Sequence, residues 1–118
     1  PGFWYYQTDK KVDYNYKSIK NLVNFLNQKE KIKQSGSVLI FNPPLKDSAI
    51  KKNLIDKWIK ISIKKANEKF IYGKELTPFL IDEINTLSNN RTLKTNMDLI
   101  INNALIAGKI AASYFKLI

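Results

Sequence analysis

Apolar residues recur at helical spacing in four stretches of the chain. In the first stretch, Ser18 is a suitable amino-terminal cap, and Ile19 and Leu22 open the apolar side that follows it. At Thr77-Pro78, threonine is a good cap and proline suits the first helical position, where its missing N–H costs nothing. The pattern therefore predicts about four helices: from Ser18 to about Lys31, from Asp47 or Ser48 to about Lys69, from Thr77 to Ser88, and from Thr92 towards Ile118.

The last of these helices has a long apolar stripe that we expect to be buried. Its members recur at the spacing of one helix face: Leu93, Met97, Ile100, Ala104, Ala107, Ala111 and Phe115. Several of these residues are small, so another backbone can approach closely.

One short segment has the pattern of a buried strand. Residues 38–41 are four consecutive apolar residues without alternation, which is typical of a strand covered on both faces in a parallel sheet. Asn42-Pro43-Pro44 ends it, because proline cannot donate to a strand ladder. One strand cannot form a sheet, so its neighbours must come from another chain or another part of the same protein. No linker or repeat divides the chain, and we interpret residues 1–118 as one portion of a single domain.

The amino-terminal segment is rich in aromatic residues. Residues 3–16 predict a half-exposed strand or an extended arm. The aromatic rings either pack on the core or stack on nucleic-acid bases, and the lack of interleaved arginine favours packing.

Composition excludes several classes of chemistry. The chain has no cysteine and no histidine, so disulfides, thiolate chemistry, histidine bases and the common zinc sites are excluded. The formal net charge of +10 suggests either nucleic-acid binding or compositional bias towards lysine, asparagine and isoleucine. Arg91 is the sole arginine and the lysines form no dense cluster, which favours bias.

The ends and the hydropathy of the chain suggest a fragment of a cytoplasmic protein. Met97 is the only methionine, which indicates a truncated or processed chain. No basic signal sequence is visible, and no apolar run reaches the ~20 residues that a membrane span requires.

Three asparagines are candidates for ligand binding. Asn42 follows the predicted strand, where ligands bind in open parallel sheets, and its amide can match the edge of a pyrimidine. The alternative is a simple Asn-Pro turn. Asn96 and Asn103 lie seven residues apart, on nearly the same side of the last helix. Each either satisfies a backbone group or faces a ligand. The acidic residues are scattered, so we assign no catalytic pair and no metal site.

Three blocks of sequence resemble a known family. GSVLIFNP at residues 36–43, GKELTPFL at residues 73–80 and LKTNMDLIINNALIAGKIAA at residues 93–112 are similar, in order and spacing, to the carboxyl-terminal part of the pseudouridine-5'-phosphate glycosidases, also called indigoidine synthase A-like proteins. The resemblance implies the helix-rich part of an α/β/α layered fold and a homotrimer. It also implies reversible cleavage of the C–C glycosidic bond of pseudouridine 5'-phosphate to uracil and ribose 5-phosphate, with manganese or another divalent cation.

The resemblance assigns few site residues to this chain. The Schiff-base lysine, the acidic glutamate and the metal-binding aspartate belong to the amino-terminal part of the family's domain, so we expect no catalytic or metal-binding residue here. Asn96, in Lys94-Thr95-Asn96, would hydrogen-bond the uracil ring. Asn42, Thr77 and Asn103 would line the pocket. The arginine usual near the start of this region is missing from residues 1–9.

Two other functions are compatible with the residues. The chain is alternatively a free-standing basic module that binds RNA or protein, or a paralogue that keeps the fold without activity. The glycosidase interpretation predicts that the chain alone is inactive and that the missing part of the domain is its main partner.

Overall fold

The computed structural model describes residues 1–116, in which four α-helices follow one another along the chain. The helices are α1 (Ile19–Lys31), α2 (Lys52–Glu68), α3 (Leu76–Leu87) and α4 (Arg91–Tyr114), and a short 3-10 turn, η1 (Gly73–Glu75), precedes α3. The prediction of about four helices is confirmed. Leu117 and Ile118, which the last helix was expected to approach, lie outside the described residues.

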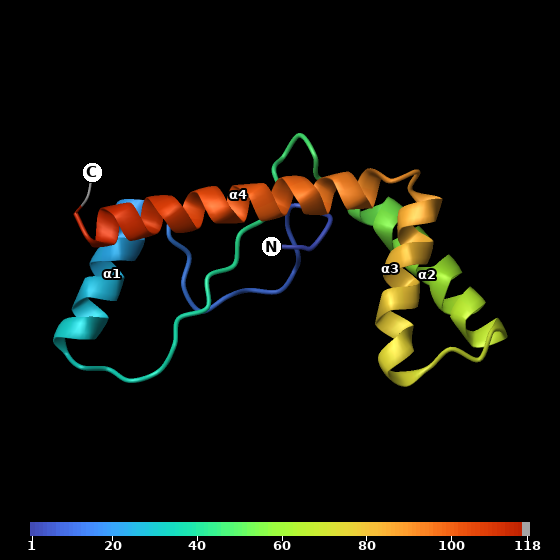
Figure 1. The fold of residues 1–118 in the computed structure, drawn as a ribbon, viewed down its shortest axis with the longest axis horizontal. Coiled ribbons are helices and arrows are strands. Elements are labelled where there is room, and N and C mark those ends of the chain that lie inside the picture. Colours follow the sequence, from blue (N-terminus) through green and yellow to red (C-terminus); the bar gives the residue numbers. More distant parts are fainter. Residues whose placement is uncertain (117–118) are drawn as a thin grey trace.

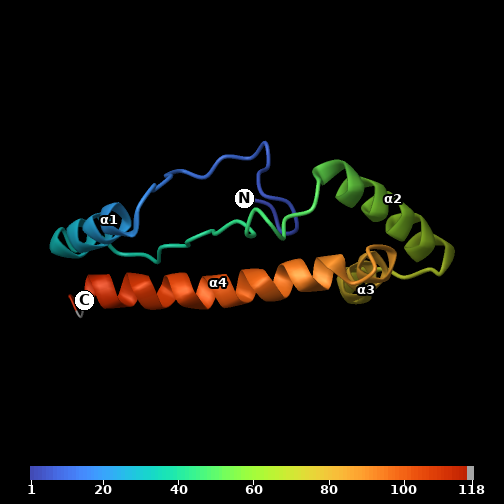
Figure 2. The same ribbon diagram turned by 90° about the horizontal axis from the view of Figure 1, so that it is seen from above.

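Helix α4 is the longest helix and runs along much of the length of the molecule, with α2 extending beyond its amino-terminal end (Figure 1). Helix α1 packs against its carboxyl-terminal end, while α2 and α3 lie at its amino-terminal end. Between the two ends, the extended connection from α1 to α2 runs beside α4 (Figure 2). The molecule is consequently elongated, with extents of 54 × 30 × 23 Å.

The start of α1 agrees with the sequence prediction. The Oγ atom of Ser18 accepts a hydrogen bond of 3.2 Å from the backbone N–H of Asn21, which satisfies one of the free donors of the first turn. Leu22 and Val23 are the buried residues of this helix.

Two other helices begin at positions that differ from the prediction. Helix α3 begins at Leu76, so Thr77 does not cap it, and Pro78 is its third residue. Proline is tolerated there because the N–H groups of the first turn have no partner within the helix. Helix α2 begins only at Lys52, because the N–H of Ile50 bonds to the carbonyl of Trp4 at 2.7 Å and holds the preceding chain outside the helix.

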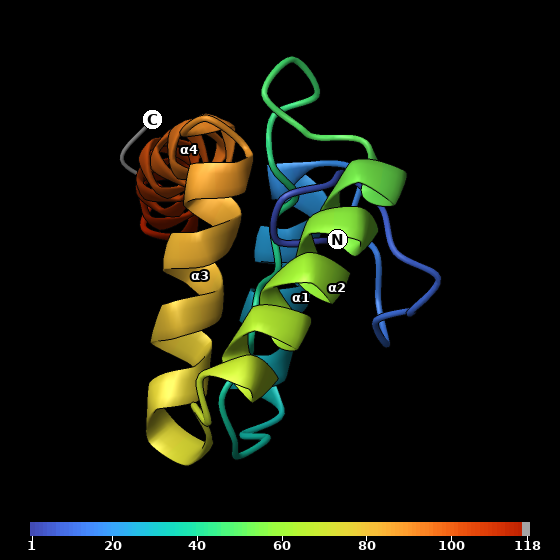
Figure 3. The same ribbon diagram turned by 90° about the vertical axis from the view of Figure 1, so that its right-hand side faces the viewer.

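The core includes residues of α2 and α3, which lie side by side (Figure 3). Trp4, from the amino-terminal arm, is 8% exposed and packs with Ile50, Ile55 and Ile84. The packing interpretation of the arm therefore holds at Trp4. Farther along the arm, Tyr14 and Tyr16 pack on Phe25 of α1 without forming a strand.

The prediction of a buried strand at residues 38–41 is wrong for the chain by itself. The segment is extended, but no strand occurs within residues 1–116. The side chains of Leu39 and Phe41 are 74% and 62% exposed. A strand ladder needs a second strand, and the described part of the chain offers none beside this segment. The α/β class predicted from the sequence is thus represented here only by its helices.

The predicted buried stripe of α4 is also wrong. Met97 and Ile100 are 55% and 67% exposed, whereas Thr92, Thr95 and Leu99 are buried. Hydropathy identifies the apolar face of a helix but not the element that covers it. The more polar side of α4 is the one that faces α1, α3 and the loop before α2. None of the helices in residues 1–116 is long and apolar enough to cross a membrane.

Candidate functional site

Two of the predicted site residues are in direct contact. The Nδ2 atom of Asn42 donates a hydrogen bond of 3.1 Å to Oδ1 of Asn103. Asn42 follows the extended segment and Asn103 lies in the second half of α4, so this bond fixes the end of the segment against the long helix. The alternative was a simple Asn-Pro turn, and the structure has its turn later, at residues 46–48.

Asn96 presents a polar atom that finds no partner in the described chain. Its Oδ1 atom is buried and accepts no hydrogen bond from any group within residues 1–116. Asn96 precedes Asn103 by about 10 Å along the helix axis, on nearly the same side of α4. A buried carbonyl oxygen without a donor costs free energy. This geometry is suited to an N–H donor supplied from outside the described residues.

Thr77 lies apart from the asparagines. It is exposed on the first turn of α3, at the end of that helix away from α4 (Figure 1). The structure thus joins Asn42 to Asn103, places Asn96 farther along the same helix side, and leaves Thr77 outside this group.

The first turns of α4 are held by a polar network that we did not predict. Asn85 accepts a bond of 3.2 Å from the N–H of Leu93 through its Oδ1 atom, and Ser88 accepts one of 3.2 Å from Thr92. The cap position of α4 is Asn90 and not Thr92, and the side chain of Ser88 supplies the acceptor for an N–H group of the first turn. The only sequence signal was the density of hydroxyl and amide side chains before an apolar run.

Thr95 connects the network to the loop that precedes α2. It is buried, and its Oγ1 atom lies 2.5 Å from the carbonyl oxygen of Ser48 and 3.0 Å from that of Arg91. Because Asn96 follows Thr95 directly, the same contacts fix the backbone from which the Asn96 amide projects.

A small cavity of about 250 Å³ lies beside this contact. Its charged lining residues are Asp47, Arg91, Lys94 and Asp98. The hydrogen bond from Lys94, at 2.9 Å, is the main reason that the pKa of Asp98 is lowered. Since Asp98 is already paired with Lys94, we assign this cavity no catalytic role.

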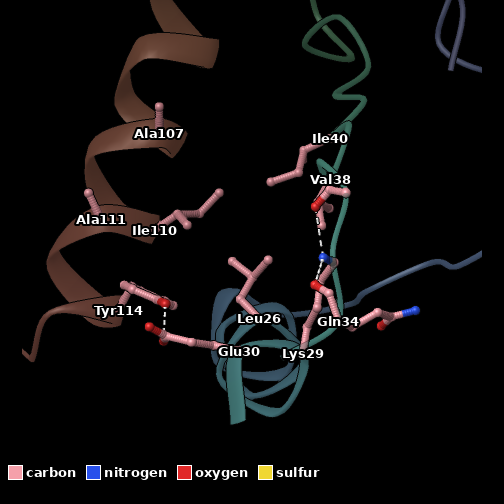
Figure 4. A pocket seen from close by; sticks show the side chains of 11 residues that line it. Leu26, Lys29, Glu30, Gln34, Val38, Ile40, Ala107, Ile110, Ala111 and Tyr114 are labelled. Carbon is pink, nitrogen blue, oxygen red and sulfur yellow. Dashed lines mark hydrogen bonds between the residues drawn. The ribbon is translucent and has the colours of Figure 1, made fainter. Parts of the chain in front are cut away.

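A larger hollow of about 590 Å³ opens at the other end of the molecule. It lies between α1, the extended segment and the carboxyl-terminal half of α4 (Figure 4). Leu26, Val38, Ile40 and Ile110 make it largely apolar. At its rim, the hydroxyl of Tyr114 donates a 2.5 Å hydrogen bond to Glu30, which raises the pKa of Tyr114.

The described residues do not fit a divalent metal site. No three acidic side chains gather in one place within residues 1–116. A site for manganese or a similar ion needs several oxygen ligands around one point.

Comparison with known proteins assigns the chain to a family. The model of the family described as indigoidine synthase A like protein matches residues 1–113. A pseudouridine-5'-phosphate glycosidase from Brachyspira hyodysenteriae is 34% identical over 117 residues, which is 99% of this chain and 38% of that protein. One from Kosmotoga olearia is 36% identical over 113 residues, which is 96% of this chain and 39% of that protein. The chain thus spans well under half the length of these relatives.

A solved structure shares the fold. The prealnumycin C-glycosynthase AlnA, determined in complex with ribulose 5-phosphate, superposes with a TM-score of 0.83 over 96% of this chain and 37% of that one, at 17% identity. The elongated arrangement of α1–α4 is therefore one that a larger protein also contains. With a family match over residues 1–113, the chain belongs to the indigoidine synthase A like protein family.

Proposed function

We propose that this chain forms part of a pseudouridine-5'-phosphate glycosidase and supplies residues of its uracil pocket. The enzyme would reversibly cleave the C–C glycosidic bond of pseudouridine 5'-phosphate to give uracil and ribose 5-phosphate. The relatives from Brachyspira hyodysenteriae and Kosmotoga olearia bear that name. Within the chain, the observation that carries the proposal is the buried, unpartnered Oδ1 atom of Asn96.

The hydrogen-bond donors of uracil are complementary to the Oδ1 atom of Asn96. A uracil ring carries N–H donors, and a buried amide oxygen that lacks a donor can accept one of them. Binding would then satisfy Asn96 at the moment that the base enters the pocket. The contact of Thr95 with Ser48 would hold the amide in place, and the pairing of Asn42 with Asn103 would fix the neighbouring wall.

The remaining functional groups would come from the rest of the family's domain. These are the Schiff-base lysine, the general acid and the ligands of manganese or another divalent cation, and none of them is assigned to this chain. Assembly as a homotrimer is part of the same proposal, and sedimentation analysis of the complete enzyme tests it.

Substitution of Asn96 tests the proposal in the enzyme that joins this chain to the rest of the domain. Asn96→Ala should reduce kcat/KM for pseudouridine 5'-phosphate by roughly ten- to a hundredfold, since one hydrogen bond in a shielded pocket contributes about 1–3 kcal/mol. The melting temperature should stay the same or rise, because alanine is the better helix former.

Asn102→Ala is the matched control. Asn102 is on the same helix and makes no side-chain hydrogen bond within residues 1–116, so its loss should leave kcat/KM unchanged. Unchanged activity of Asn96→Ala together with a lower melting temperature would show that Asn96 is a structural amide, and the pocket assignment would be wrong.

A further inference from the structure

The connection that leaves α1 doubles back over the last turn of that helix. The backbone N–H groups of Lys33 and Gln34 bond to the carbonyls of Glu30 and Lys29, at 2.9 and 3.1 Å. Lys33 and Gly36 have φ values of 52° and 95°, and such left-handed conformations reverse the direction of the chain. The three consecutive carbonyl groups of residues 34–36 are thereby turned towards one point beside α1.

The side-chain ammonium of Lys29 occupies this point. Its Nζ atom donates hydrogen bonds of 2.6, 3.1 and 2.7 Å to the carbonyl oxygens of Gln34, Ser35 and Gly36 (Figure 4). An ammonium group has three N–H donors and no acceptor, so each donor has one carbonyl. Within residues 1–116, no other group donates a hydrogen bond to these three carbonyls.

The partner of the Lys29 charge consists of backbone dipoles alone. No carboxylate of the described chain forms an ion pair with Lys29, and the adjacent Glu30 accepts the hydrogen bond of Tyr114 instead. The carboxyl-terminal end of α1 adds negative potential at the same place, because the last carbonyls of a helix lack partners within it. Carbonyl oxygens that converge on one point are ligands that proteins use for monovalent cations. Hydrogen bonds from a charged donor are also stronger than those between neutral groups.

We propose that the carbonyls of Gln34, Ser35 and Gly36 form a monovalent-cation site, and that the tethered ammonium of Lys29 is its permanent occupant. The occupied site fixes the path of the connection from α1 to α2. This inference is independent of the proposed function and of any role of Asn96, so uracil release by the complete enzyme neither supports nor contradicts it.

The site matters because the connection has few other fastenings. No hydrogen bond joins residues 37–41 to the rest of the described chain. The bond from Asn42 to Asn103 holds the far end of this stretch, and the Lys29 site holds the near end. Acylation of the Lys29 amine would remove its charge and leave it one N–H donor, so the modified chain would lose the near fastening.

Nuclear magnetic resonance of the unmodified, ¹⁵N-labelled chain tests the occupancy directly. The Nζ atom of Lys29 should give a resolved ammonium signal, and its hydrogens should exchange with water roughly tenfold more slowly than those of Lys31, since bonded N–H groups are protected. Lys31 is the matched comparison, because it lies in the same last turn of α1 and makes no side-chain hydrogen bond within residues 1–116.

A pair of substitutions tests the effect on the connection. Lys29→Met and Lys31→Met remove the same charge from the same helix turn, and methionine is about as good a helix former as lysine. Amide hydrogen exchange of Lys33 and Gln34 should become roughly tenfold faster in Lys29→Met, because the charge-assisted bonds that hold the connection are lost. It should be unchanged in Lys31→Met, and the helicity of both variants should be that of the original chain.

An added amine tests whether the site selects a cation. Propylammonium has the length of the part that Lys29→Ala removes, so propylammonium chloride should slow the exchange of the Gln34 amide in that variant. Sodium chloride at the same concentration should not, because it screens charge without supplying N–H donors.

Several results would overturn the inference. These are fast exchange of the Lys29 ammonium, equal amide exchange in Lys29→Met and Lys31→Met, or no slowing of Lys29→Ala by propylammonium. Equal slowing by both salts would assign the effect to screening and would also refute the cation site. If Lys29→Met lost its helicity, the ammonium signal of the unmodified chain would decide, since that measurement needs no substitution.

Discussion

Single side chains join parts of this molecule that are far apart in the sequence. The amide of Asn42 bonds to that of Asn103, and Tyr114 bonds to Glu30 at a separation of 84 residues. The sequence singled out Asn42, Asn96 and Asn103 because amides interrupt apolar stretches there. It did not predict their partners, since these depend on how the connection between α1 and α2 runs beside α4.

The bond between Tyr114 and Glu30 has a consequence at alkaline pH. The hydrogen bond to Glu30 raises the pKa of Tyr114 above 10.0, so the folded state favours the protonated phenol. This contribution to the free energy of unfolding is complete below pH 10 and is lost as the pH rises through the folded pKa. Tyr114→Phe should therefore lower stability at neutral pH and flatten its alkaline decline, measured by urea unfolding from pH 8 upwards. In Glu30→Gln, the ultraviolet titration of Tyr114 should move to lower pH; an unmoved titration would contradict the assigned cause.

The helices show how far periodicity determines an element. Apolar spacing located all four helices, because that spacing follows from the helix geometry itself. It misplaced the starts of α2 and α3, which depend on the bond from Ile50 to Trp4 and on the turn at η1. It also failed at residues 38–41, because a strand exists only with a neighbour to pair with.

The two sides of α4 should respond differently to substitution. Leu99 is 8% exposed, and Leu99→Ala should reduce the free energy of unfolding of the chain by about 2–5 kcal/mol. Ile101 is 67% exposed, and Ile101→Lys should change it by less than about 0.5 kcal/mol. Urea unfolding of both variants, with helicity as a check, measures the difference. Equal losses would mean that the outer side of α4 is covered in the chain alone.

The molecule as a whole is less compact than a typical single domain of its length. The radius of gyration is 18.0 Å, whereas a compact domain of this length would have about 13.5 Å. The accessible surface is 9229 Å², against about 6,600 Å² for a compact monomer of 13.7 kDa. The chain also spans only 38% of the length of the Brachyspira hyodysenteriae relative.

The chain alone should consequently be inactive and weakly cooperative. Incubation with pseudouridine 5'-phosphate and manganese should release no uracil, because the Schiff-base lysine and general acid of the proposed enzyme lie outside this chain. Its thermal unfolding should be broad, since few apolar side chains are buried. Chromatography of the reaction and calorimetry of the chain measure the two properties. Turnover comparable to that of a complete enzyme would refute the division of roles that we propose.

The exposed segment Val38–Phe41 also affects the solubility of the chain. Short, uncharged stretches of high β propensity are templates for aggregation when they are exposed, and the side chains of Leu39 and Phe41 are exposed here. The net charge of +10 opposes this, because like-charged copies repel one another. Salt screens that repulsion. The four exposed residues therefore make the solubility of the chain sensitive to ionic strength.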